Sequence, residues 1–299
     1  MVVAASASAH LPPSHHVDAF VDRVERLCPV PAAAQRVVEL AAGEQADFRE
    51  IARALAVDAA LAAEIMRIAN SVMYGRARTV SDLDQAILTI GLDELREMAA
   101  AMALVAAFRS DASLSLDLHM RSLLAGALAR GLATQLGYLR PATAFVCGLL
   151  SDIGAMACLA IDAEGYGKLW AACQGEPGAR ARAELKRYGA SSNEIGKRLL
   201  QRNALPTVVV EAVGAQVDDS PDALGPLPRV CLFARQASWS VVRVVDESDL
   251  SSFGEILSAL ALRYRFDGIE HQALMTLCVE ASARCDSELR RLRHSSPRM

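Results

Sequence analysis

The longest strongly apolar run in this chain of 299 residues extends from Phe145 to Ile161, FVCGLLSDIGAMACLAI, and one carboxylate, Asp152, lies in its middle. Two glycines, Gly148 and Gly154, flank the Ser151–Asp152 pair. The run has about the length of a short transmembrane helix, but the central Asp and the glycines favour a buried core helix. Because a buried carboxylate needs a polar or charged partner, the elements that pack against this run must supply such a partner to Asp152.

The composition favours helices around that core. Alanine and leucine dominate, aromatic residues make up only 5%, and β-branched runs are short. Apolar residues recur at helical spacing, Pro141 can open the central helix, and Ser191 with Glu194 has the spacing of a capping box. The sequence therefore predicts an all-α fold.

Breaks in this pattern suggest the organisation of the chain. We expect flexible tails at 1–15 and 293–299, an N-terminal helical lobe at about 16–110, a second helical lobe at about 114–225 and a C-terminal helical extension at 226–292. The polar segment RSDASLS separates the two lobes.

Charge and cysteine usage exclude several classes of function. The formal net charge is −4 and the basic residues form no large cluster, so nucleic-acid binding is not favoured. The seven cysteines contain no C-x-x-C pair, which is typical of small core residues in a reducing compartment. The N-terminus lacks the pattern of a signal peptide. We expect a cytoplasmic protein without a membrane span.

Two stretches resemble a known family. They are LCPVPAAAQRVVEL, residues 27–40, and ANSVMYGRARTVSDLDQAILTIG, residues 69–91. Both resemble the HDOD domain, the HD-related output domain of bacterial signalling proteins, and the resemblance covers about residues 18–225. It implies a two-lobed helical domain with an HD-like core. The matching residues are Pro29, Pro31, Asn70, Ser71, Tyr74, Gly75, Ser81, Gln85, Ala86, Ile87 and Gly91.

The same resemblance locates a degenerate site. Hydrolytic HD relatives hold divalent metals with an early His, a His–Asp pair and further ligands downstream. The corresponding positions here are Arg121, the pair Ser151–Asp152, and Ser192, so the resemblance implies no metal, no cofactor and no catalytic residue. His119 is two residues from the first position and would face elsewhere on its helix. Asp152 either pairs with Arg121 or bonds to backbone groups or water.

A second candidate site is the turn after residue 69. One interpretation is a rigid corner, in which Asn and Ser bond to loose backbone groups and Gly adopts a positive φ. The other is a corner that recognises a ligand or a partner, because two arginines follow directly. The residues of this corner are Asn70, Ser71, Tyr74, Gly75, Arg76 and Arg78.

The resemblance favours a non-enzymatic regulator of bacterial signal transduction that acts as a protein-interaction module. Its expected partners are other signalling proteins, with cyclic-dinucleotide signalling enzymes among the candidates, and no oligomeric state is implied. One alternative is a residual metal-dependent phosphohydrolase acting on nucleotides or cyclic dinucleotides. Another is the binding of a small anionic ligand through Arg121 without turnover.

Overall fold

The computed structural model describes a large part of the chain, and all its regular elements are helical. No strand occurs among the described residues, so the all-α prediction is confirmed. The described residues are 13–30, 36, 40, 48–57, 62, 65–66, 69–70, 80–108, 110, 112–137, 140–173, 177–241, 250–266, 269, 272–276 and 278–279.

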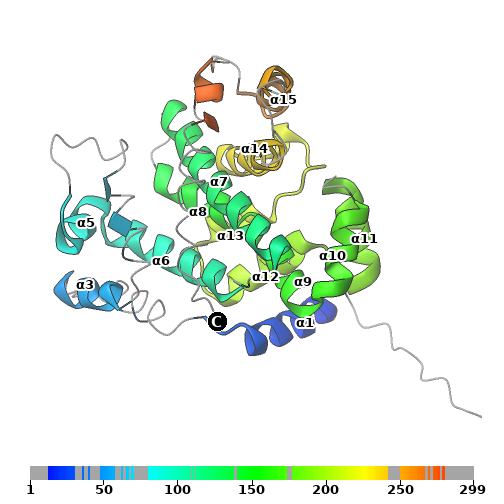
Figure 1. Cartoon of the computed structure of the whole chain (residues 1–299), viewed down its shortest axis with the longest axis horizontal. Coiled ribbons are helices and arrows are strands. Elements are labelled where there is room, and N and C mark those ends of the chain that lie inside the picture. The colour runs from blue at the N-terminus through cyan, green and yellow to red at the C-terminus, as the bar shows by residue number, and fades with distance from the viewer. Residues whose placement is uncertain are drawn as a thin grey trace, which may run out of the picture.

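Helices from the first part of the chain lie along one side and the base of the molecule (Figure 1). Helices α3 and α5 are in contact there, and α6 connects them to the centre. Gly91 ends α5 and precedes α6 with a φ of 88°, a left-handed conformation that glycine adopts without strain. The bounds are Pro13–Leu27 for α1, Phe48–Ala56 for α3, Leu83–Ile90 for α5 and Leu92–Ala107 for α6.

Helices α7 (Ser113–Gln135) and α8 (Pro141–Leu150) form the closest pair in the centre. Pro141 begins α8, as the sequence predicts. A Cβ atom built on Gly148 would lie 2.4 Å from the carbonyl oxygen of Ala125. Only glycine at this position lets the two backbones approach so closely.

The apolar run is not one continuous helix. Helix α8 ends at Leu150, and α9 (Ile153–Ile161) begins after the Ser151–Asp152 pair. By length and composition the stretch Pro141–Ile161 could cross a membrane, yet 89% of its apolar window is buried inside the protein. The core interpretation is therefore confirmed, and the expectation of a single unbroken helix is wrong.

The following helices wrap around this centre. The capping box predicted at the start of α12 is present, with the Ser191 and Glu194 side chains each accepting from the backbone N–H of the other residue. The bounds are Ala163–Ala172 for α10, Pro177–Tyr188 for α11, Ser192–Arg202 for α12, Thr207–Gly214 for α13, Pro221–Ala223 for a short 3-10 helix, Pro226–Val241 for α14 and Leu250–Arg263 for α15.

The expected lobes share one hydrophobic core. A single cluster of buried apolar residues contains Val21 of α1, Ile87 of α5, Leu150 of α8 and Val213 of α13. The predicted division near residues 110–114 therefore does not separate two cores within the described residues.

The predicted C-terminal extension also packs on the domain. Helix α14 contacts α7, α8 and α13, and it carries α15 on its outer side (Figure 1). Phe233 lies in a second buried cluster together with Leu128 of α7 and Leu257 of α15. Cys231 on the same helix belongs to the cluster that contains α8. The described start of the extension is thus part of the folded core.

Candidate functional site

The break between α8 and α9 turns Asp152 toward the interior. Asp152 precedes α9 as its N-cap, and its carbonyl oxygen accepts the first helical bond from Met156 at 3.1 Å. Its side chain makes no capping bond to α9. Gly154 allows the start of α9 to touch α12, because a Cβ there would lie 1.8 Å from the Ser192 carbonyl oxygen. The Asp152 carboxylate is thus free to bind other elements, and its contacts are with α14 and α11.

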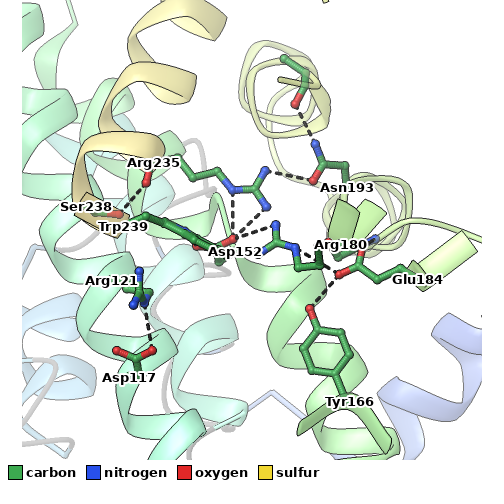
Figure 2. Close-up of polar contacts among 12 residues, drawn as sticks. Asp117, Arg121, Asp152, Tyr166, Arg180, Glu184, Asn193, Arg235, Ser238 and Trp239 are labelled. Carbon is green, nitrogen blue, oxygen red and sulfur yellow. Dashed lines mark hydrogen bonds and ion pairs between the residues drawn. The ribbon is translucent and has the colours of Figure 1, made fainter. Parts of the chain in front are cut away.

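Two residues of α14 hold the Asp152 carboxylate (Figure 2). Nε and one terminal nitrogen of Arg235 lie 2.9 and 2.8 Å from Oδ1 of Asp152. The indole N–H of Trp239 donates to Oδ2 at 3.2 Å. The Arg235 and Asp152 side chains are only 5% and 1% exposed, so this is a buried ion pair.

A second arginine, Arg180 of α11, lies on the other side of the carboxylate. Its terminal nitrogen is 3.7 Å from Oδ1 of Asp152, and its Nε is 3.3 Å from Oε1 of Glu184. Glu184 also accepts from the Tyr166 hydroxyl at 2.8 Å and from the backbone N–H of Ser192 at 2.7 Å. These contacts join α10, α11 and α12 to the Asp152 site (Figure 2).

The surrounding cations keep Asp152 ionised. Burial by itself raises the pKa of the Asp152 carboxyl, but Arg235, Arg180 and the Trp239 N–H more than offset that effect. The pKa of Asp152 consequently lies below its ordinary value. The pKa of Arg180 is raised: burial lowers it, but the nearby Tyr166, Asp152 and Glu184 have the larger combined effect.

Both tryptophans of the chain lie in this site and are in contact with arginines. The guanidinium carbons of Arg121 and Arg180 lie 4.9 and 4.6 Å from the Trp239 ring centre. Arg180 is also 5.2 Å from the ring of Trp170. Such contacts are favourable because the face of an indole ring is electron-rich.

The predicted pairing of Arg121 with Asp152 is wrong, and so is the alternative in which Asp152 bonds only to backbone or water. Nε of Arg121 donates to Asp117 at 2.9 Å, one helical turn earlier on α7. Arg121 reaches Asp152 only indirectly, through the Trp239 ring. A local carboxylate four residues away binds Nε of Arg121, whereas Asp152 takes its partners from α14 and α11.

The structure also describes three other residues that were singled out in the sequence, which are Ser192, Ser151 and His119. Ser192 contributes its backbone N–H to Glu184, while the Ser151 hydroxyl is buried without a hydrogen-bond partner among the described residues. His119 points toward α6, a direction that the sequence did not predict beyond its facing away from the Arg121 position. Its ring nitrogens lie 2.7 Å from the Ser115 carbonyl oxygen and 2.9 Å from that of Val105.

The corner at Asn70 is described only at its ends. The Asn70 amide donates to the carbonyl oxygens of Met66 and Val80 at 3.0 and 2.9 Å, and Oδ1 accepts from the Val80 N–H at 2.7 Å. Asn70 therefore fixes the two ends of the connection, as the rigid-corner interpretation requires of it. The remaining corner residues lie outside the described residues; they are Ser71, Tyr74, Gly75, Arg76 and Arg78.

The thiols of the core do not form a reactive site. Burial raises the pKa of Cys147 and Cys158 well above the ordinary value and that of Cys231 to about 12. The thiolate is the reactive form of cysteine, so these side chains act as small core residues.

The residues at the Asp152 site do not fit a catalytic metal. The described residues contain no group of three or more His, Cys, Asp or Glu side chains that could hold a metal ion. Ser151 stands where the resemblance places a His ligand, and both oxygens of Asp152 already accept from Arg235 and Trp239. A metal ion would have to displace these groups to reach the carboxylate.

Comparison with known proteins decides the family. The model of the HDOD domain matches residues 27–218. The chain belongs to the HDOD family. This family is related to the HD phosphohydrolases and is usually considered non-catalytic. The family match includes Arg121, Ser151, Asp152 and Ser192, whose assignment to a degenerate HD site stays a prediction from the sequence. No curated protein matches the chain.

Solved structures share the fold. An HDOD domain protein of unknown function from Geobacter sulfurreducens has a TM-score of 0.59 and 22% identity, over 94% of this chain and 96% of its own. A protein from Shewanella amazonensis, provisionally described as a phosphohydrolase, has a TM-score of 0.63 and 22% identity, over 88% and 93%. A provisionally described signal transduction protein from Marinobacter aquaeolei has a TM-score of 0.58 and 19% identity, over 94% and 66%.

Several members of the site were not expected from the sequence. Arg235 and Trp239 lie after residue 218, where the family match ends. Arg180 and Glu184 lie in α11, a polar helix that carries no recognisable motif. One signal was available. Arg235 interrupts the apolar segment VCLFARQASW of α14, and a cation in such a helix needs a buried anion.

Proposed function

We propose that this HDOD protein is a non-catalytic regulator of bacterial signal transduction, located in the cytoplasm, that acts by binding other proteins. The observation that carries the proposal is the state of Asp152. This carboxylate, at the position of the HD pair, is bound by Arg235, Arg180 and Trp239, and so serves as a structural acid. The family membership and the signal-transduction relative support a regulatory role.

Metal-dependent turnover is the first thing to measure. Purified protein would be assayed on nucleotides and cyclic dinucleotides with added manganese or iron, and its metal content would be determined. We expect no turnover above that of the Asp152→Ala variant. Turnover that needs metal and is abolished by Asp152→Ala would instead establish the residual phosphohydrolase.

Partner binding is tested by capture from cell lysate of a bacterium that carries the protein. The bait would be the full chain, and an HDOD protein from another species would serve as the matched control. We expect signalling proteins, cyclic-dinucleotide enzymes among them, to be retained by this chain and to bind it again after purification. Failure of every retained protein to bind the purified chain directly would contradict the interaction role.

Binding of a small anion without turnover is a second candidate. It is favoured by a group of buried donor atoms around the site that have no hydrogen-bond partner among the described residues: one terminal nitrogen of Arg121, one of Arg180, and the Ser151 hydroxyl. An anion would satisfy such donors, since it brings acceptors only. Inorganic phosphate and a panel of nucleotides should then raise the thermal midpoint in wild type but not in Arg121→Gln.

A further inference from the structure

The Arg235 guanidinium is surrounded by oxygen atoms in the way a bound cation would be. Nε and one terminal nitrogen face Oδ1 of Asp152 at 2.9 and 2.8 Å. The other terminal nitrogen donates to Oδ1 of Asn193 at 2.9 Å. Each nitrogen of the guanidinium therefore has an oxygen partner, and Arg235 is only 4% exposed (Figure 2).

The oxygens around this guanidinium are fixed by contacts of their own. The Asn193 side-chain amide donates to the Ala215 carbonyl oxygen at 2.8 Å, which directs its Oδ1 toward Arg235. Trp239 holds the second oxygen of Asp152 at 3.2 Å. Asp152 before α9 and Asn193 of α12 thus provide the acceptors, and α14 brings both the cation and the Trp239 N–H that holds the second carboxylate oxygen.

The charges of the site balance without any added ion. The guanidinium groups of Arg121, Arg180 and Arg235 accompany three carboxylates, which belong to Asp117, Asp152 and Glu184. An additional divalent cation would bring two positive charges that no described side chain of this cluster compensates. The site is therefore matched to a monovalent, planar donor group and not to a metal ion.

We propose that Asp152 and Asn193 form a cation-binding site and that its resident ligand is the guanidinium of Arg235, carried by α14. In this arrangement α14 acts as a tethered ligand that occupies the degenerate HD site permanently. The proposal goes beyond the regulatory role, because it concerns what fills the site and holds whether or not the chain binds other proteins.

A rescue experiment tests this proposal directly. Arg235→Ala removes an ethylguanidinium group, so ethylguanidinium chloride is added to the purified full-length variant at constant ionic strength. The thermal midpoint is followed by far-UV circular dichroism and by tryptophan emission, since both tryptophans lie beside the site. At about ten times its dissociation constant the ligand should raise the midpoint of Arg235→Ala by about 3 °C.

Matched controls separate site binding from general effects of the salt. Wild type and Arg187→Ala should show no rise, because the first retains its own guanidinium and the second loses a surface arginine that pairs with Asp162. The double variant Asp152→Asn with Arg235→Ala should lose the rescue. If Arg235→Ala does not fold alone, its refolding yield with ethylguanidinium becomes the measurement.

Two results would overturn the proposal. One is that ethylguanidinium chloride and sodium chloride have the same effect on the thermal midpoint, or on the refolding yield, of Arg235→Ala. The other is a midpoint that rises with manganese and not with ethylguanidinium, which would identify a metal site that the arginine merely blocks.

Discussion

Replacing Asp152 by asparagine should destabilise the protein strongly, because it removes one carboxylate between two buried guanidinium groups. Arg235 and Arg180 are only 4% and 3% exposed, so solvent cannot take over the role of Asp152. The substitution also places an NH2 group against donors, since both carboxylate oxygens now accept hydrogen bonds. Removing one partner of a buried pair costs about 3 to 5 kcal/mol.

The loss is measured by urea unfolding of wild type and Asp152→Asn, followed by far-UV circular dichroism and tryptophan emission. Because Trp170 and Trp239 both contact Arg180, the emission reports this site in particular. The control is Lys168→Ala, which removes a surface pair with Glu164 whose side chains are 75% and 82% exposed. It should cost less than about 0.5 kcal/mol.

A double-mutant cycle identifies the origin of the loss. If uncompensated charge is the cause, Asp152→Asn combined with Arg235→Gln should cost clearly less than the sum of the two single substitutions. Additive losses, or a loss below about 1 kcal/mol for Asp152→Asn alone, would refute the view that this pair organises the site.

Three further predictions concern other parts of the argument. Gly154→Ala should cost more than about 3 kcal/mol in urea unfolding, because its Cβ would overlap the backbone of α12. The control Gly167→Ala on α10, where a Cβ would meet no neighbouring atom, should be neutral or slightly stabilising, and equal effects of the two substitutions would contradict the close contact of α9 with α12. The stability that Asp152 contributes should be constant above the ordinary carboxyl pKa of 3.8 and be lost as the pH falls through its lower folded value, so the difference in thermal midpoint between wild type and Asp152→Asn should shrink only below about pH 4. Asn70→Ala, which removes three bonds to backbone groups, should lower stability by about 1 to 2 kcal/mol, and an unchanged urea midpoint would argue against the rigid corner.

The sequence predicted the helices well where local signals set them. Pro141 begins α8 and Ser191 with Glu194 caps α12, because proline geometry and capping bonds act over a few residues. The break at Ser151–Asp152 was missed. Apolar residues continue on both sides of it, and hydrophobic periodicity alone does not show where a run of buried residues ends one helix and begins the next.

The sequence predicted the buried carboxylate of the site but not its partners, because these partners lie far from it along the chain. That a buried Asp152 needs a partner follows from the cost of burying a charge, and the sequence made this clear. Which residue supplies the partner does not follow, because Arg235 lies 83 residues away and reaches Asp152 only when α14 packs on the centre. The sequence offered Arg121 as one of two alternatives for Asp152, and Asp117, one helical turn away on α7, binds Arg121 instead.

The partners of Asp152 extend the structural unit beyond the residues that the family model matches. The family model ends at residue 218, yet Arg235 and Trp239 of α14 complete the hydrogen bonds of the carboxylate that lies at the centre of that region. The same helix buries Phe233 against α7 and Cys231 against the core that contains α8. Charge compensation and apolar packing therefore act through one element, so the HDOD region of this chain and α14 are stabilised together.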